Sequence, residues 1–184
     1  GRYSFNVYTE FNGNVNKIGS KFFEVERIRT GVLSNPNLDQ IEAFLVDLEN
    51  TYKNYSVVNH KFSKIKRSNK SIPSLISKTS NYKSYVENYN QIKEMINMID
   101  VFVSGNKSKK DIMEKDTETI SDRLSVAVRG INSSYGPTSM QISSLDKAKS
   151  LITEFDKMLK ELSLEFNKLK NQLEGELESL ILDW

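Results

Sequence analysis

Apolar residues recur along most of the chain at intervals of three and four residues, which is the spacing of one face of an α-helix. A first run covers residues 7–28 and contains Gly13 and Gly19. Each glycine weakens a helix by about 1 kcal/mol relative to alanine. A second run covers residues 37–65 and starts at Asn37, a favourable N-cap residue, with Gln40 at the capping-box position. The pattern predicts helices over both runs.

Three further runs follow in the second half of the chain. Residues 82–103 keep the helical spacing without a miss, and residues 113–131 form a fourth run that ends at the helix-breaking segment 132–137. The last run, residues 138–182, would form a helix about 67 Å long at a rise of 1.5 Å per residue. Six residues of its apolar face are expected to be buried together: Leu145, Ile152, Phe155, Leu159, Leu162 and Phe166.

These runs predict an all-α fold, an elongated up-and-down bundle of four to five long antiparallel helices in one domain spanning residues 1–184. A helix as long as the last one needs partners along its whole length, and earlier helices can supply them by folding back. Tyr3, Phe5 and Val7 alternate with polar residues, so residues 1–7 could be a strand-like lead-in or the start of the first helix. No segment alternates strongly enough to predict a sheet.

Composition removes several classes of chemistry. The 184 residues include no cysteine and a single histidine, His60, which excludes disulfides, a thiolate nucleophile and cysteine-based metal sites. The net charge of +2 is too small to indicate nucleic-acid binding. No apolar run reaches the roughly 18–20 residues of a transmembrane helix. A catalytic pair of carboxylates is the one enzymatic route left open, because the chain has 24 Asp and Glu residues, but no two of them lie inside an apolar stripe. We therefore expect no catalytic, cofactor-binding or metal-binding residues, no transmembrane segment and no enzyme activity.

A basic tract lies near the end of the second run. Its cations are Lys61, Lys64, Lys66, Arg67 and Lys70, and no acidic residue lies among them. Cations near a helix C-terminus suit the helix dipole, so a solvated helix end is one interpretation. A contact for an acidic partner or a polysaccharide is the second. Nucleic acid is the weakest interpretation, because lysines outnumber arginines in a chain that is not otherwise basic.

Five tyrosines lie at helical spacing in the second and third runs: Tyr52, Tyr55, Tyr82, Tyr85 and Tyr89. Aromatic stripes of this kind usually form a core or a half-buried seam between helices. The alternative is a surface that stacks against sugar rings.

A resemblance to a known family rests on two short motifs. Arg123-Leu124 lies on a predicted helix, and Gly136-Pro137-Thr138-Ser139-Met140-Gln141 precedes the long last helix. Pro137 cannot continue a helix, whereas Thr138 can cap the next one with Gln141 as its reciprocal partner. Residues of about 86–184 resemble the C-terminal helical region of secreted bacterial proteins with a sialidase-like or sortilin-like β-propeller. The resemblance implies a non-catalytic, extracytoplasmic or secreted region.

The leading functional hypothesis is a non-enzymatic helical interaction or spacer module that packs against a neighbouring domain or subunit. The chain opens without an initiator methionine, so we expect it to be part of a larger extracytoplasmic protein. Besides the basic tract, the expected contact residues lie near the two ends: Tyr3, Phe5, Leu180, Ile181 and Trp184.

Two alternatives remain open. An extracytoplasmic four-helix ligand-sensing domain would have a pocket between helices lined by the tyrosines. A helical membrane-active toxin would need a concealed apolar hairpin of roughly membrane length, and none is visible in the sequence.

Overall fold

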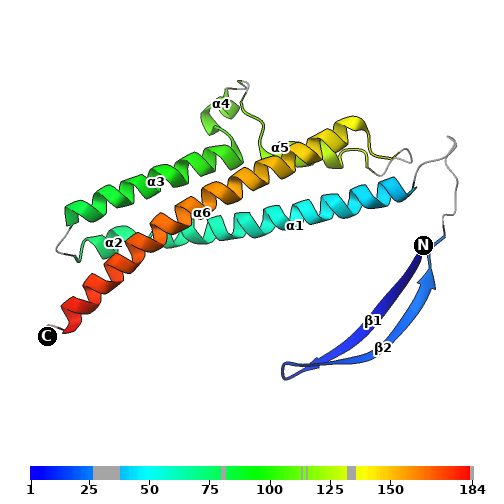
Figure 1. Ribbon diagram of the computed structural model, residues 1–184, viewed down its shortest axis with the longest axis horizontal. Coiled ribbons are helices and arrows are strands. Elements are labelled where there is room, and N and C mark those ends of the chain that lie inside the picture. The colour runs from blue at the N-terminus through cyan, green and yellow to red at the C-terminus, as the bar shows by residue number, and fades with distance from the viewer. Residues whose placement is uncertain (27–37, 80–81, 113, 115, 132–135, 183–184) are drawn as a thin grey trace. The chain divides into compact units, whose positions relative to one another are not determined.

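The computed structural model describes residues 1–26, 38–79, 82–112, 114, 116–131 and 136–182. Contacts divide the chain into two compact units, Gly1–Pro36 and Asn37–Trp184. The first unit contains a β-hairpin and the second is helical (Figure 1). The helical domain expected over residues 1–184 therefore includes a unit whose described residues form a hairpin and no helix.

The hairpin consists of two antiparallel strands, β1 (Arg2–Phe11) and β2 (Asn14–Glu24). Asn12 and Gly13 form the two-residue loop, with φ angles of 51° and 79°. Positive φ at both central residues is the requirement of a type I′ turn, whose twist matches the twist of paired strands. Asn-Gly is the dipeptide that meets this requirement at least cost, so the sequence favours a hairpin at this point.

The predicted helix over residues 7–28 is therefore wrong within the described residues, and so is the all-α fold class. Gly13, interpreted as a weak helical residue, lies in the turn. The alternation of Tyr3, Phe5 and Val7 is that of a strand, and β1 continues it to Phe11. Most apolar residues of this segment are aromatic or β-branched, which favours strands over helices. The apolar residues of this segment therefore recur every three or four positions although the segment forms strands.

The second unit contains six helices among its described residues. Their bounds are α1 (Leu38–Asn69), α2 (Ile72–Ile76), α3 (Tyr82–Ser104), α4 (Lys107–Asp111), α5 (Ile120–Val128) and α6 (Ser139–Leu182). Only α1, α3 and α6 are long, since α5 has nine residues and α2 and α4 have five each. The prediction of four to five long antiparallel helices is therefore wrong, although helices do form over the second, third and last predicted runs.

Helix α6 is the element against which α1, α3 and α5 pack. Figure 1 shows α1 and α6 running in the same direction and α3 running in the opposite one. Side-chain contacts agree with this arrangement. Lys149 in the first part of α6 binds Asp47 of α1, and Phe155 further along packs edge-on against Phe62 with ring centroids 5.7 Å apart. Helix α5 packs against α6 near the N-terminus of α6, and α3 packs against α6 near the C-terminus of α6.

The core of this unit follows the apolar stripe of α6. All six residues expected on that face are buried, each at most 7 % exposed, which confirms the prediction for Leu145, Ile152, Phe155, Leu159, Leu162 and Phe166. Ile92, Ile96, Ile99 and Val103 of α3 and Ile120 and Leu124 of α5 join the same cluster. The helical period therefore located the buried face correctly.

The start of α6 is capped as its sequence predicts. The Gln141 backbone N–H donates to the Thr138 hydroxyl, and the Thr138 backbone N–H donates to the Gln141 side-chain oxygen at 2.7 Å. The Gln141 amide nitrogen also donates to the Arg129 carbonyl just after α5. Gln141 is buried, so these bonds satisfy polar groups that would otherwise be costly. The bond to Arg129 also ties the start of α6 to the C-terminal end of α5.

The turn chemistry of the hairpin gives a testable prediction. Gly13→Val should destabilise the hairpin by about 1–2 kcal/mol, because an L-residue at positive φ is strained even where space is open. Gly19→Val is the matched control, since Gly19 lies in β2 without a positive φ and nothing lies within 4 Å of its added Cβ. The measurement is the nuclear Overhauser effect between the Tyr3 and Phe23 rings, which stack 5.8 Å apart. Equal loss of this signal in both variants would contradict the turn assignment.

Candidate functional site

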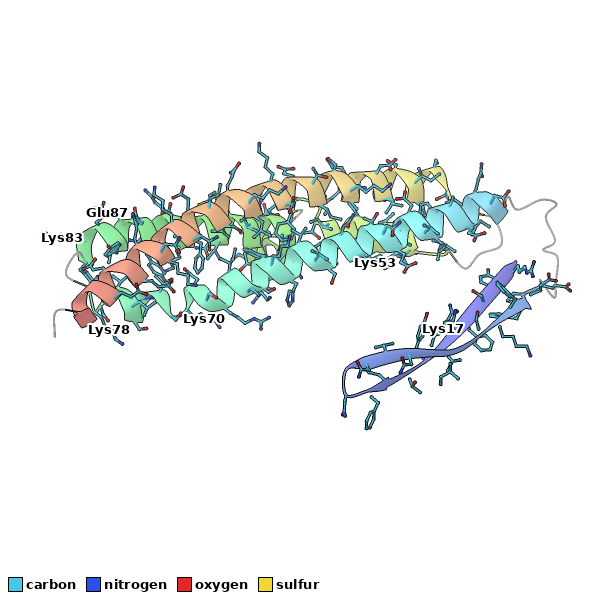
Figure 2. The ribbon with its side chains drawn as sticks, turned by 60° about the horizontal axis from the view of Figure 1, so that its bottom comes forward. Lys17, Lys53, Lys70, Lys78, Lys83 and Glu87 are labelled. Atoms are coloured by element: carbon cyan, nitrogen blue, oxygen red, sulfur yellow. The ribbon has the colours of Figure 1, made fainter. Side chains whose placement is uncertain are left out.

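The hairpin carries large apolar side chains that it does not bury. Every residue of β1 and β2 is exposed. Phe11 is 78 % exposed and Phe22 is 63 % exposed. Figure 2 shows the side chains of this unit extending from the ribbon. The exposed apolar set of this unit is Tyr3, Phe5, Val7, Tyr8, Phe11, Val15, Ile18, Phe22, Phe23 and Val25.

One face of the hairpin gathers aromatic rings at its open end. Tyr3 lies opposite Phe23 in the strand register, and their rings stack with centroids 5.8 Å apart. The Phe5 ring lies 6.2 Å from that of Phe23. On the other face, the Arg2 guanidinium lies 5.1 Å from the centre of the Phe22 ring. Tyr3 and Phe5, both predicted contact residues, therefore lie together in one exposed aromatic cluster.

The two edges of the hairpin differ. Strand β2 contains an irregularity: Val7 pairs with Gly19 but Tyr8 pairs with Lys17, so Ile18 is an extra residue on that strand. A bulge of this kind and charged residues such as Lys17 and Lys21 discourage pairing with another strand. Strand β1 has no extra residue, no lysine and no proline. Its edge is therefore the one that remains open to another strand.

A second candidate site is a basic groove lined by residues near the C-terminal ends of α1 and α3. Lys66 of α1 binds Asp100 of α3 at 2.5 Å, and the Lys66 ammonium lies 5.3 Å from the centre of the Phe62 ring. The groove has a volume of about 420 Å³. Its lining is polar at most positions: Asn59, Phe62, Ser63, Lys66, Arg67, Lys70, Asp100, Val103 and Ser104. Three cations therefore face one carboxylate.

The structure divides the predicted basic tract. Lys66, Arg67 and Lys70 line the groove, and Figure 2 places Lys70 at the end of α1. Lys61 instead lines shallow hollows beside Asp156 of α6. Lys64 is exposed and lines none of the hollows described for this part of the chain. The sequence could not reveal the contribution of Asp100, because it lies on another helix.

The tyrosines do not gather around a cavity. Tyr55, Tyr85 and Tyr89 are half-buried against the core, whereas Tyr52 and Tyr82 are exposed. Burial raises the pKa of Tyr55, and a hydrogen bond to Glu176 on α6 is the main cause of a raised pKa at Tyr85. The hollows described for this part of the chain are lined by other residues. Tyr55, Tyr85 and Tyr89 therefore pack against the helical core as half-buried residues.

The sequence predicts neither a metal site nor a transmembrane segment. Within the described residues, no group of three or more His, Asp or Glu side chains is arranged to hold a metal ion. None of the helices there is long and apolar enough to cross a membrane.

The predicted contact residues at the C-terminus cannot be placed. The side chains of Leu180 and Ile181, and the whole of Trp184, lie outside the described residues.

Comparison with known proteins yields no relative. No protein-family model, no curated protein and no solved structure matches this chain.

Proposed function

We propose that this protein is a non-enzymatic interaction module in which the β-hairpin docks onto a protein partner and the helical unit is its folded support. The observation that carries the proposal is the exposed apolar set of the hairpin. A two-stranded sheet is marginally stable in water, and a third strand or a packed surface is needed to stabilise it. Exposed apolar surface of this extent is typical of interaction sites.

A protein surface fits the hairpin better than a lipid one. The hairpin exposes backbone N–H and C=O groups along its strand edges, and lipid offers them no hydrogen-bond partner. A protein partner can satisfy these groups by adding a strand while it also covers the aromatic rings. Tyrosine, phenylalanine and arginine, all present in β1, are residue types enriched at protein interfaces.

Photo-cross-linking in the cells that express the chain tests this proposal. A benzophenone amino acid at Tyr8 should yield an adduct of defined mass, whereas the same group at Leu164 should not. Leu164 is the matched control because it is 70 % exposed on α6. Phe5→Asp should lower the Tyr8 adduct about tenfold or more, since burial of a phenylalanine contributes roughly 1.5–3 kcal/mol. Equal labelling from both positions, or none from Tyr8, would contradict docking through the hairpin.

A further part of the proposal is that the chain is an accessory region of a larger extracytoplasmic or secreted protein. This part rests on the resemblance of residues 86–184 to the helical region of β-propeller proteins. Its motif residues form the capped junction described above: Arg123 and Leu124 lie in α5, and Thr138 and Gln141 cap α6.

A second candidate function is binding of an anionic polysaccharide in the basic groove. The specific observation is the excess of cations there. Asp100 pairs with Lys66, whereas the structure shows no ion pair for Arg67 or Lys70 within the described residues. Both side chains are exposed, so they can contact a sulfate or carboxylate group without a desolvation penalty of the size that a buried charge would have.

Calorimetric titration with heparin, as the polysaccharide probe, tests the groove. Arg67→Gln with Lys70→Gln should weaken binding about tenfold or more, because a hydrogen bond to a charged group contributes ~1.5 kcal/mol or more. Lys53→Gln with Lys160→Gln is the charge-matched control, since these lysines form ion pairs within single helices. Equal weakening by both double variants, or no heparin binding, would contradict a site in the groove.

A further inference from the structure

The open edge of β1 exposes a defined set of backbone groups. Gly1 and Val25 exchange both of their backbone hydrogen bonds, so that pair is a hydrogen-bonded rung of the hairpin. Backbone groups alternate between inward and outward along a strand of an antiparallel pair. The outward-facing N–H and C=O groups of β1 therefore belong to its even-numbered residues: Arg2, Ser4, Asn6, Tyr8 and Glu10.

The sequence of this edge is self-complementary in charge. Arg2 and Glu10 lie four residues before and four residues after Asn6, and both belong to the outward-facing set. When two copies of β1 run antiparallel and are centred on Asn6, Arg2 of each copy faces Glu10 of the other. Opposite charges directly across a strand pair stabilise the pairing, whereas like charges weaken it.

We infer that the partner of the hairpin is a second copy of this chain, whose β1 pairs antiparallel with β1 about Asn6 to form a four-stranded sheet. The inference rests on the proposed docking function and names its occupant. The contact is isologous, so one surface serves both copies and the assembly closes as a dimer. Four strands meet the minimum that a sheet needs for independent stability.

Backbone geometry selects the same register as the charges. Outward-facing residues can pair only with outward-facing residues of the other copy. One strand can therefore slide along the other only in steps of two residues. The register centred on Asn6 engages all five outward-facing residues of each copy. A shift toward the N-terminus leaves Glu10 unpaired, and a shift toward the C-terminus leaves Arg2 unpaired.

The face of the sheet that carries Tyr3, Phe5 and Phe23 gains cross-strand pairs in this register. Phe5 of each copy faces Val7 of the other, which is an aromatic and β-branched pair of a kind that stabilises sheets. Tyr3 faces Thr9 in the same way. Because Tyr3, Phe5 and Phe23 form one cluster in each copy, pairing brings two aromatic clusters onto one face of a continuous sheet.

Sedimentation of the full chain with two proline variants tests the edge. Asn6 and Ser20 face each other across one rung of the hairpin, and the N–H of each points away from the partner strand. Asn6→Pro removes a donor from the β1 edge, and Ser20→Pro removes one from the β2 edge, while hydrogen bonds within the hairpin remain. We expect Asn6→Pro to weaken the dimer about tenfold or more and Ser20→Pro to leave it intact. The Tyr3–Phe23 contact serves as the check that both hairpins fold.

Charge variants test the register. Glu10→Arg gives a chain with Arg at both positions, and Arg2→Glu gives a chain with Glu at both. Each alone should dimerise about tenfold more weakly than the wild type, since like charges meet at both ends of the pairing. Mixed in equal amounts, the two chains should form a heterodimer, because both ends are then complementary.

Three results would overturn the inference: a wild-type chain that stays monomeric at every soluble concentration, proline variants that behave alike, or charge variants that fail to associate when mixed. Failure of this inference is distinguishable from failure of the docking function. A Tyr8 adduct whose added mass differs from that of the chain overturns self-pairing and leaves docking to another protein. No adduct at all overturns docking itself.

Discussion

The buried face of α6 is the constraint on which the helical unit depends. A helix of 44 residues exposes a long apolar stripe unless other elements cover it along its length. Helix α1 covers it from one side, whereas α5 and α3 cover its first and last parts in turn. The Thr138 and Gln141 cap places the start of that stripe against the end of α5. The basic groove is lined by residues close to the C-terminal ends of α1 and α3.

The hairpin has no comparable way to bury its apolar residues. Two strands form a single layer, so the hairpin cannot bury either of its faces within itself. The helical unit buries an apolar core of its own, whereas no residue of the two strands is buried. This contrast between the two units explains why the functional proposal concerns the hairpin, although most of the chain is helical.

Sequence periodicity predicted the three long helices and the buried face of α6, but not the short helices or the hairpin. The buried residues of α6 follow the helical period, because one face of a helix packs against its neighbours along the whole length. The apolar residues of the hairpin also fit a spacing of three and four, so periodicity alone favours a helix there, and the strongest local signal against it is the Asn12-Gly13 turn. The basic groove could be predicted only from the way α1 and α3 pack, because that packing brings Asp100 to Lys66, 34 residues away in the sequence. Such a contact depends on packing and cannot be deduced from a local pattern.

Amide hydrogen exchange measured at several protein concentrations tests the central claim most directly. The outward-facing amides of Ser4, Asn6 and Tyr8 have no partner strand within one copy of the hairpin. They should exchange rapidly in dilute solution and become protected as concentration rises, whereas the amides of Leu159 and Leu162 in α6 should be protected at every concentration. Protection of Ser4, Asn6 and Tyr8 that does not change with concentration would contradict the account.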